Sequence, residues 1–321
     1  MSARRRVLIT GLPYFTKRIA ALLDDREWCS RIVVQNASPT PLHKRAYHAQ
    51  LLLGVPMCDV VYQIGGPFLE DRVITAAKIF GRPVVLHWVG SDAARAREEA
   101  RVRQQDKSSI VHHWADAPWL VEELAQAGVS AVVVPSCGVT LRPASPLPAG
   151  ALTVLAYLPD SRWDFYGGRL IEELARELPD VNFLVAANEG HGRSLSANVT
   201  FLGWRSTMDE IYERCHALVR MPEHDGLSSM VIEALAAGRH VVWNHRMPGC
   251  LYALTADDMR ARVLELRQLQ QAGRLSLNHA GKEYADSEFA VATVAEKMHT
   301  RFESILTSRS PTTAMVHRAR N

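Results

Sequence analysis

The chain alternates between short apolar runs and longer segments in which apolar residues recur every third or fourth position. Short apolar runs bounded by glycine or proline predict buried strands, and the wider spacing predicts amphipathic helices. In the first half this pattern gives strands at 7–10, 31–35, 58–64, 83–88, 109–115 and 131–134, and helices at 16–23, 43–53, 73–80 and 118–126. Strands that alternate with helices predict an α/β fold with a mostly parallel sheet covered on both faces.

A proline-rich segment, residues 142–150, interrupts this alternation and is the best linker in the chain. The alternation then restarts, with strands at 152–157, 182–186, 199–204, 217–219 and 239–243, and helices at 168–177, 208–215, 230–237, 257–272 and 279–305. A length of 321 residues also suggests two domains. We therefore expect an N-terminal domain at 1–145, a C-terminal domain at 150–306 and a flexible tail at 307–321.

Composition bears on the cellular compartment in which we expect the protein to work. The sequence has no apolar run of about 18 residues and no signal-peptide pattern, so we expect neither a transmembrane helix nor export. The five cysteines are scattered without a Cys-x-x-Cys pair and are interpreted as reduced thiols. These observations predict a cytoplasmic protein with at most peripheral membrane contact.

Charge is unevenly spread along the chain. Residues 1–145 carry 18 Lys and Arg against 13 Asp and Glu, whereas the remainder carries 19 against 21. A basic first half suits an anionic acceptor or a lipid surface. Ordinary surface arginines are the other interpretation, and the small size of the excess favours it.

Candidate chemistry is concentrated at residues 220–244, which read R-M-P-E-H-D-G-L-S-S-M-V-I-E-A-L-A-A-G-R-H-V-V-W-N. A predicted strand leads into a loop and then into a helix that Ser228 or Ser229 can cap through a side-chain oxygen. Gly238 stands where that helix needs a left-handed residue to end. The free amides and positive dipole end at the start of such a helix suit a phosphate.

Two carboxylates frame this predicted anion site. Asp225 lies in the loop and Glu233 lies in the helix, with seven residues between them. Taken alone, the pair has a simpler interpretation, because Asp-Gly is a common turn and a helical Glu is usually a solvated surface residue. The order of the elements around the pair favours a ligand site.

The same stretch resembles the E-x7-E region of retaining glycosyltransferases with two Rossmann-like domains, the GT-B fold, in the family-4-like group. The resemblance implies an acceptor-side first domain, a donor-binding second domain and a last helix that crosses back to the first domain. The consensus sequence of this region in the family is close to E-G-F-G-L-x-x-x-E-A-M-A-C-G-K-P-V-V. This chain reads D-G-L-S-S-M-V-I-E-A-L-A-A-G-R-H-V-V, with Asp225 in place of the first Glu. The resemblance implies a nucleotide diphosphate-sugar donor, with Glu233 accepting hydrogen bonds from ribose hydroxyls and Asp225 contacting sugar hydroxyls. The amides that would face the diphosphate belong to Gly226, Leu227, Ser228 and Ser229.

Three sequence segments in the first half resemble segments of the first domain of the same family, and they occur in the same order. They are H-W-V-G-S-D at 87–92, A-D-A-P-W-L-V-E-E-L at 115–124 and the stretch 128–138. In the family, a histidine at a position like His87 contacts the donor sugar. A structural histidine whose hydrogen bonds are made inside the fold is an equally open interpretation.

Ligands of two-lobed α/β proteins bind where strands end, in the cleft between the lobes. His87 ends a predicted strand of the first half and Asp225 follows one in the second, so we expect both to face such a cleft. We also assign Gly11, in the loop after the first strand, to donor binding.

One part of the family pattern is missing from this chain. The family places an Arg and a Lys, as G-R-x-x-x-x-K-G, after the first strand of the second domain, where they neutralise the departing phosphate. Here residues 157–167 read Y-L-P-D-S-R-W-D-F-Y-G, so Tyr166 occupies the lysine position and the arginine position is not clearly filled. Arg162 is the nearest replacement, followed by Arg220 and Arg205. The departure leaves open an altered donor or a weakened activity.

The resemblance implies a retaining, hexosyl-type glycosyltransferase in which His87, Asp225 and Arg162 are the catalytic candidates. Its mechanism would be front-face transfer, in which the leaving diphosphate accepts the proton of the acceptor. The expected partners are a nucleotide-sugar donor and a small-molecule, glycan or lipid-linked acceptor. We expect no further cofactor, no metal, because Asp-x-Asp is missing, and no nucleic acid, because no stripe of basic and aromatic residues exists.

Two other functions remain open at this stage. The missing lysine favours a non-catalytic protein that binds a nucleotide-sugar. A related nucleotide-sugar epimerase is slightly disfavoured by the linked order of Asp225, Glu233 and Gly238.

Overall fold

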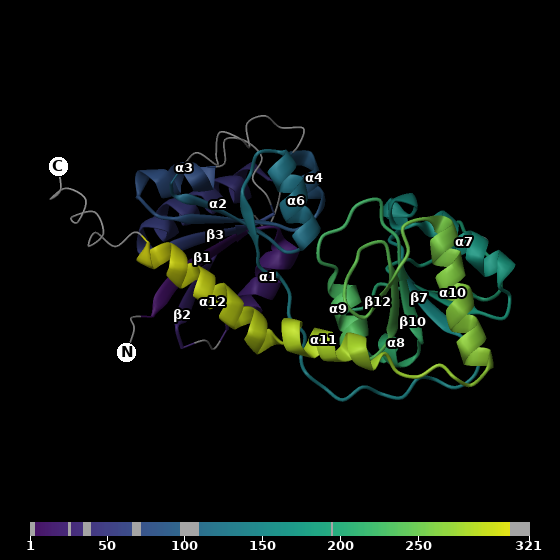
Figure 1. Cartoon of the computed structure of the whole chain (residues 1–321). Helices are drawn as coiled ribbons and strands as arrows, with labels where there is room; N and C mark the ends of the chain where they lie inside the picture. The colour runs from purple at the N-terminus through teal and green to yellow at the C-terminus, as the bar shows by residue number, and fades with distance from the viewer. Residues whose placement is uncertain are drawn as a thin grey trace. The chain divides into compact units, whose positions relative to one another are not determined.

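The computed structural model describes residues 4–24, 27–34, 40–65, 72–96, 109–193 and 195–308. The chain divides into two compact units: unit 1 is Met1–Gly138 with Val291–Asn321, and unit 2 is Val139–Ala290. Each unit contains a six-stranded parallel sheet flanked by helices (Figure 1). The predicted tail lies outside the described residues from residue 309 onward.

Unit 1 has the strand order β2-β1-β3-β4-β5-β6. Its strands are β1 (Arg5–Gly11), β2 (Cys29–Val33), β3 (Val60–Ile64), β4 (Val84–Trp88), β5 (Val111–Ala115) and β6 (Ala131–Val133). Its helices are α1 (Pro13–Leu22), α2 (Pro41–Gly54), the 3₁₀ helix η1 (Val55–Met57), α3 (Arg72–Ile79), α4 (Ser91–Ala96), α6 (Pro118–Gln126) and α12 (Val291–Thr307). Every strand and helix predicted for the first half is present, with ends shifted by a few residues.

The two faces of this sheet have different covers. Helices α2 and α3 and η1 share a core with Leu8 and Leu86 of the strands. Phe302 of α12 packs against Tyr62 and Trp114, with ring centroids 6.1 and 4.9 Å apart. The C-terminal helix is therefore part of the core of unit 1.

Unit 2 has the strand order β12-β11-β10-β7-β8-β9. Its strands are β7 (Thr153–Tyr157), β8 (Asn182–Ala186), β9 (Val199–Gly203), β10 (Ala217–Arg220), β11 (His240–Trp243) and β12 (Cys250–Tyr252). Its helices are η2 (Asp160–Arg162), η3 (Asp164–Tyr166), α7 (Gly168–Glu177), α8 (Asp209–Glu213), α9 (Ser229–Ala236), α10 (Ala256–Gln271) and α11 (His279–Phe289). The short edge strand β12 was not predicted.

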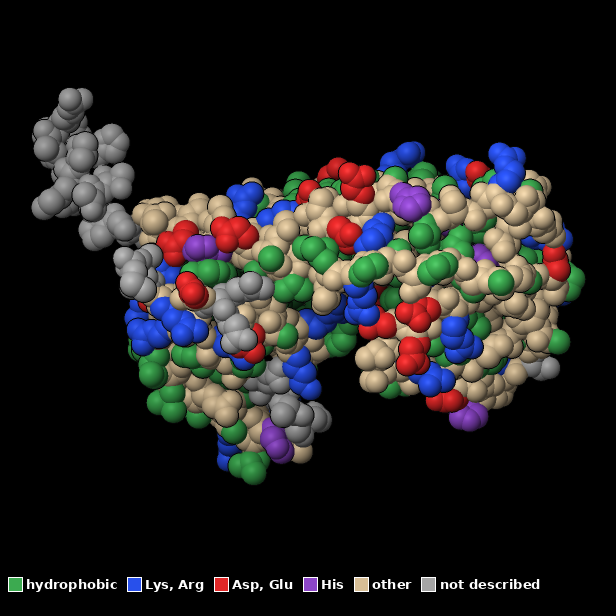
Figure 2. All heavy atoms as spheres, turned by 90° about the horizontal axis from the view of Figure 1, so that it is seen from below, with side chains coloured by type: hydrophobic (Ala, Val, Ile, Leu, Met, Phe, Trp, Pro, Cys, Tyr) green, Lys and Arg blue, Asp and Glu red, His purple; other side chains and the backbone are tan. Residues whose placement is uncertain are grey.

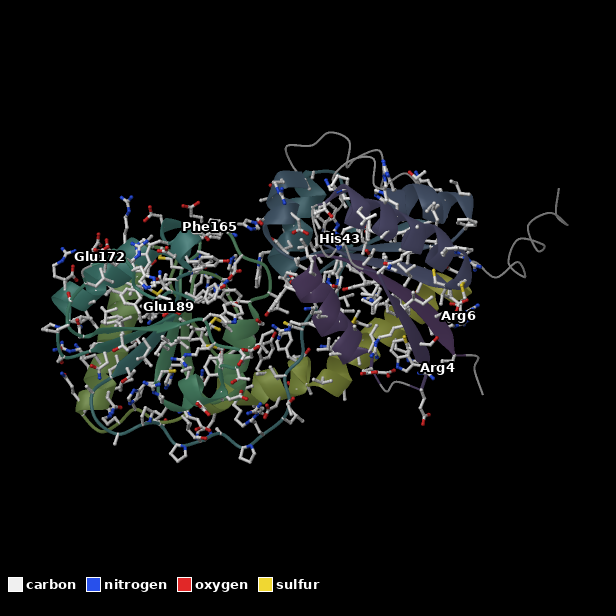
Figure 3. All side chains as sticks on the ribbon, turned by 180° about the vertical axis from the view of Figure 1, so that it is seen from behind. Arg4, Arg6, His43, Phe165, Glu172 and Glu189 are labelled. Atoms are coloured by element: carbon white, nitrogen blue, oxygen red, sulfur yellow. The ribbon has the colours of Figure 1, made fainter. Side chains whose placement is uncertain are left out.

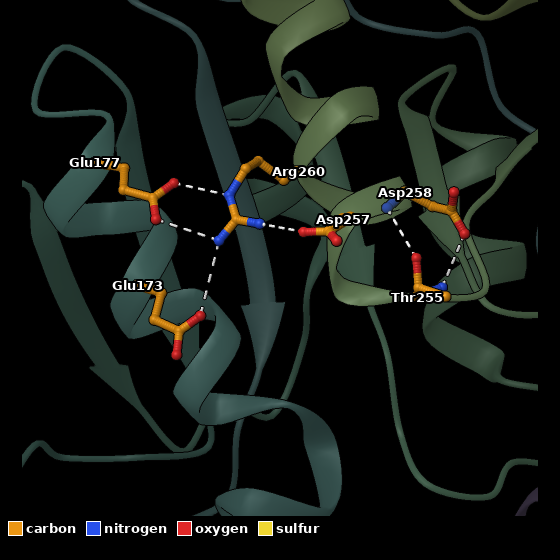
Figure 4. Close-up of polar contacts among 6 residues, drawn as sticks. All are labelled: Glu173, Glu177, Thr255, Asp257, Asp258 and Arg260. Carbon is orange, nitrogen blue, oxygen red and sulfur yellow. Dashed lines mark hydrogen bonds and ion pairs between the residues drawn. The ribbon is translucent and has the colours of Figure 1, made fainter.

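Helices α7 and α10 share one core with the sheet of unit 2 and are also linked by charge. Arg260 of α10 bonds to Glu177 of α7 at 2.8 Å and to Asp257 at 2.7 Å (Figure 4). Thr255 and Asp258 form a reciprocal capping box that fixes the start of α10 (Figure 4).

The single helix predicted at 279–305 is wrong in one respect, because the structure breaks it at Ala290. This residue has extended dihedral angles, φ −53° and ψ 138°. It bridges to Val139, whose N–H donates to the Phe289 carbonyl at 2.7 Å. The segments at which the chain enters and leaves unit 2 are therefore hydrogen-bonded to each other.

The proline-rich segment 142–150 belongs to unit 2, and the boundary between the units falls before it, after Gly138. The buried Arg239 guanidinium donates to the carbonyls of Ser145 and Pro146 at 2.8 and 3.3 Å. Lys282 Nζ donates to the Arg142 carbonyl at 2.8 Å. These hydrogen bonds hold the segment against unit 2. None of the helices in the described ranges is long and apolar enough to cross a membrane.

Candidate functional site

The strand order of unit 2 marks one place where a ligand is expected. β7 is the first strand of the unit; β8 and β9 follow on one side of it, and β10, β11 and β12 lie on the other. The order therefore reverses between β7 and β10, and open α/β sheets bind ligands outside the carboxyl ends of the strands at such a switch point. The loop after β7, residues 158–167, and the loop after β10, residues 221–228, meet there.

These two loops hold each other in place. The Glu223 N–H donates to the Phe165 carbonyl at 2.9 Å. Gly167 has a positive φ of 81°, and a Cβ at this position would lie 2.9 Å from the Met221 carbonyl oxygen. Asn244, after β11, donates from Nδ2 to the Pro222 carbonyl at 2.8 Å. The rim of the switch point is therefore fixed by backbone contacts before any ligand binds.

A buried ion pair lies at the centre of this rim. Arg220, the last residue of β10, donates from Nε and Nη2 to the two oxygens of Asp225 at 2.5 and 2.9 Å. The two side chains are only 9% and 12% exposed. Burial works to lower the pKa of Arg220, but the Asp225 carboxylate outweighs it, so the pKa is raised. The pair fixes the Asp225 carboxylate in one orientation.

Aromatic rings from the β7 side complete the surroundings of Arg220. Its guanidinium carbon lies 5.1 Å from the Tyr166 ring centroid and 6.0 Å from that of Tyr157. These distances fall within the range of cation–π attraction. Tyr166, which occupies the lysine position of the family pattern, therefore packs beside an arginine that comes from another strand.

Helix α9 begins next to Asp225. Ser228 is its N-cap residue, as predicted, but its side chain makes no capping hydrogen bond. The first amides of a helix have no partner within the helix, so this end suits an anion. Gly238 has φ +73° after the last turn, which confirms the predicted left-handed stop.

Glu233 lies on α9 and is oriented by a residue that the sequence analysis did not identify. The Tyr212 hydroxyl donates to Glu233 Oε2 at 3.0 Å. Burial, followed by the nearby Glu233 charge, raises the pKa of Tyr212 well above its usual value, so the hydroxyl stays protonated and donates. No local pattern points to Tyr212, because it lies on α8 and the strand β10 separates it in sequence from Glu233 on α9.

Arg162 lies in the loop after β7 but takes no part in the buried ion pair of Arg220 and Asp225. It is exposed, and its guanidinium carbon lies 3.8 Å from the Phe165 ring centroid. Figure 3 labels Phe165 and Glu172, which both line a hollow of about 600 Å³ on unit 2. The other lining residues are Asp160, Ser161, Arg162, Trp163, Asp164, Arg169 and Arg193. Arg205, the third cation considered, is exposed in the loop after β9.

His87, in unit 1, is fully buried at β4. Its Nδ1 shares a 2.5 Å hydrogen bond with the Tyr62 hydroxyl, and its ring packs edge-on against Trp114. Burial lowers the pKa of His87 to about 3. This geometry favours the interpretation of a histidine held inside the fold, because the imidazole has no exposed surface with which to contact a sugar.

Gly11 lies at the switch point of unit 1, between β1 and β3. It has φ +116°, and a Cβ there would lie only 2.0 Å from the Ile64 carbonyl oxygen. The next N–H, that of Leu12, donates to the same carbonyl at 3.0 Å. Close approach of the two strand ends is a sufficient reason for glycine at this position.

The structure thus brings one group of predicted residues together and leaves two apart. Asp225, the start of α9, Glu233 and Arg162 share the carboxyl edge of unit 2, whereas His87 and Gly11 belong to unit 1. The Asp225 partner could have been inferred from sequence, because a charged residue that ends a buried strand needs an opposite charge nearby.

The thiols of unit 2 are held in the protonated form. Burial raises the pKa of the Cys215 and Cys250 thiols to about 12, which makes them poor nucleophiles. Among the residues that the structure describes, no three His, Cys, Asp or Glu side chains gather as a metal site.

Comparison with known proteins gives results at the level of structure. No family model matches the sequence, and no curated protein matches it. Among solved structures, sucrose-phosphate synthase from Thermosynechococcus elongatus is 14% identical, with a TM-score of 0.70 over 95% of this chain and 100% of its own. The HepE protein of Anabaena, solved with UDP and glucose, is 14% identical, with a TM-score of 0.67 over 94% and 100%.

These similarities decide the architecture. The fold is of the GT-B type. The predicted α/β class with two Rossmann-like domains is confirmed. UDP-GlcNAc 2-epimerase from Neisseria meningitidis shares the fold at 11% identity, with a TM-score of 0.52 over 92% of this chain and 98% of its own. Identities this low establish the fold alone, so the reaction has to be argued from the residues.

Proposed function

We propose that this protein transfers a hexosyl group from a nucleotide diphosphate-sugar to an acceptor, with retention at the anomeric carbon. One observation carries the proposal: at the switch point of unit 2, Arg220 fixes Asp225 beside the start of α9, and Tyr212 orients Glu233 on the same helix. A nucleotide-sugar presents an anion and two sets of hydroxyls. These residues offer amides for the anion and two oriented carboxylates for the hydroxyls.

The proposed roles follow from position along the helix. The amides of Gly226, Leu227, Ser228 and Ser229 would receive the diphosphate. Glu233, about one turn into α9, would accept from ribose hydroxyls. Asp225 would accept from sugar hydroxyls while it is held by Arg220, a positioning residue that acts through that carboxylate.

The reaction would need no side-chain nucleophile. The bond between the anomeric carbon and the phosphate oxygen breaks, the acceptor oxygen bonds to the same face of that carbon, and its proton passes to the leaving phosphate. Positive charge near the diphosphate would assist departure. Arg162 is exposed beside the switch point and is the cation that we propose for this role. We assign donor binding to unit 2 and acceptor binding to unit 1.

Several structural relatives support the choice of donor. HepE was solved with UDP and glucose, and the O-GlcNAc transferase GtfA of pneumococcus with UDP and GlcNAc. We therefore propose a uridine diphosphate-hexose as the donor class.

The test is donor turnover by the full chain. UDP-glucose and UDP-GlcNAc would be incubated with the protein without acceptor, and released UDP and sugar would be followed by nuclear magnetic resonance. We expect slow release of UDP with the sugar first appearing as the α-anomer, abolished in Asp225→Asn. The matched control is Asp180→Asn, an exposed aspartate that pairs with Arg267 and lies outside the two loops of the switch point, which should keep the activity.

Two outcomes would replace the proposal. The epimerase fold among the relatives makes a C2-epimerised nucleotide-sugar one product to look for. Binding of donor without any turnover, with or without a panel of acceptors, would instead indicate a non-catalytic binding protein, as the tyrosine at position 166 would then suggest.

A further inference from the structure

Helix α2 carries an apolar stripe that faces away from its own core. Leu42, Ala46, Ala49 and Leu53 recur at helical spacing and are all exposed, with Leu42 at 74% and Leu53 at 71%. Leu51, on the opposite side, is the leucine that α2 buries in the core. Apolar residues at this spacing normally mark the buried side of a helix. Here they form a second, outward apolar side.

Further exposed apolar residues lie on the elements that pack beside α2. Met57 of η1 is 56% exposed, and Ile79 and Phe80 at the end of α3 are 71% and 39% exposed. Arg82 joins the ends of the two helices by donating from Nη2 to the Pro56 carbonyl at 2.8 Å. We define the α2–α3 face by its exposed large apolar residues, Leu42, Leu52, Leu53, Met57, Ile79 and Phe80.

The charge on the same elements has one sign. Residues 40–58 and 72–91 contain no Asp or Glu at all. Their basic residues are Lys44, Arg45, Arg72, Lys78 and Arg82. Figure 2 shows hydrophobic and basic side chains together along the lower left border of unit 1.

Unit 2 provides the contrast. Helices α7 and α10 carry both signs and pair them, as in Arg260 with Glu177 and Arg267 with Asp180. Acidic and basic side chains are interspersed on the part of unit 2 visible in Figure 2. The charge pattern of the α2–α3 face is therefore a local property and not the general surface of the protein.

We propose that the α2–α3 face binds the surface of an anionic phospholipid bilayer. Exposed leucines together with exposed Lys and Arg side chains on the same elements match both parts of such a surface, the acyl boundary and the anionic headgroups. A second copy of the chain fits less well, because two faces of the same charge would repel. Nucleic acid fits less well because the centre of the face is aliphatic. The proposal goes beyond the transferase reaction, and vesicle binding can be measured without any donor.

The test is co-sedimentation of the full chain with two kinds of vesicle. One kind is pure phosphatidylcholine, and the other contains 30% phosphatidylglycerol as the anionic probe. We expect binding to the anionic vesicles only, weakened by raising the salt from 0.1 to 0.5 M because exposed charges are then screened. Each basic residue near an anionic surface should contribute roughly a fivefold change in affinity.

Two double variants test the two halves of the face. Leu42→Gln with Leu53→Gln should weaken binding by roughly tenfold or more, because apolar insertion is lost. Lys44→Gln with Arg45→Gln should weaken it by roughly 25-fold. All four side chains are exposed, so thermal unfolding should be unchanged, which separates lost binding from lost folding.

Matched controls come from unit 2. Leu141→Gln with Leu254→Gln replaces two leucines that are 57% and 59% exposed, and Arg176→Gln with Arg274→Gln removes two exposed charges. Both controls should bind like the native chain. The proposal is overturned by absence of binding to either vesicle, by equal losses in the controls, or by a dimer in light scattering that Leu42→Gln with Leu53→Gln converts to a monomer.

Discussion

The two units share one topology but use the same position in it differently. In unit 1 the switch point between β1 and β3 is closed by Gly11, whose backbone touches Ile64. In unit 2 the switch point between β7 and β10 holds a charged pair, Arg220 and Asp225, under two tyrosine rings. The comparison teaches that topology offers a binding position, and that the residues at the strand ends decide whether it is equipped for a ligand.

A second contrast concerns His87 of unit 1 and Glu233 of unit 2. His87 of unit 1 is enclosed and its pKa is lowered to about 3, so it is neutral at ordinary pH. Glu233 of unit 2 is partly exposed and oriented by Tyr212. Glu233 is therefore an accessible group at the edge of unit 2, whereas His87 is a neutral group enclosed in unit 1.

The largest expected effect comes from breaking the buried pair. Arg220→Met leaves the Asp225 carboxylate without its partner, and the free energy of unfolding should fall by about 3–5 kcal/mol. The measurement is chemical denaturation followed by circular dichroism, together with titration of UDP.

A double variant then separates the structural role of the pair from its functional one. Arg220→Met combined with Asp225→Leu removes both charges, and such replacements are often neutral for stability. We expect stability to recover while affinity for UDP-sugar does not. Recovery of both would contradict the assignment of Asp225 to sugar binding.

Adding a side chain at the switch point of unit 1 should have the next largest effect. Gly11→Ala places a Cβ against the Ile64 carbonyl at a residue with positive φ, so we expect a loss of about 1–3 kcal/mol in unfolding free energy from strain. Gly81→Ala is the matched control, because its φ is +62° and no atom lies within 4 Å of the added Cβ. Equal losses in the two variants, measured by denaturation, would refute the close-approach argument.

The pH dependence of stability tests the buried, neutral state of His87, which contrasts with the charged edge of unit 2. A histidine whose pKa is lowered by folding binds fewer protons in the folded state, so stability is full above pH about 6.5 and falls as the pH drops towards 3. The slope contributed by this group should approach about 1.4 kcal/mol per pH unit. His87→Gln should flatten the dependence, whereas His43→Gln, an exposed control, should leave it unchanged. Identical pH profiles for all three chains would contradict the buried, neutral state.

The smallest expected effect concerns the orientation of Glu233. Tyr212→Phe removes one hydrogen bond to a partly exposed carboxylate, which should lower UDP affinity by about five- to tenfold and cost about 1 kcal/mol in stability. Tyr284→Phe in the same unit serves as the control. Unchanged affinity in both variants would show that the bond does not prepare the site.

Local patterns in the sequence were enough for the elements and for one half of the site. The apolar runs predicted every strand except β12, which is only three residues long and has no fully buried position. Gly238 and the Asp225–Glu233 spacing placed α9 correctly because caps and helical spacing are local properties.

Contacts between distant segments could not be read in this way. The break at Ala290 depends on Val139, and the orientation of Glu233 depends on Tyr212. Burial of His87 depends on Tyr62 and on the cover provided by α12. Each of these features is set by tertiary packing, which overrides local propensity.

The measurement that tests the central claim most directly is a thermal-shift panel of nucleotides and nucleotide-sugars with the native chain, Glu233→Ala and Glu265→Ala. A ligand at about one hundred times its Kd should add about 2.7 kcal/mol to stability. The account predicts a shift with uridine diphosphate compounds that is lost in Glu233→Ala and kept in Glu265→Ala, whose side chain is exposed on α10. If no nucleotide shifts the native chain, or if Glu233→Ala responds like the native chain, the donor site does not lie at the edge of unit 2.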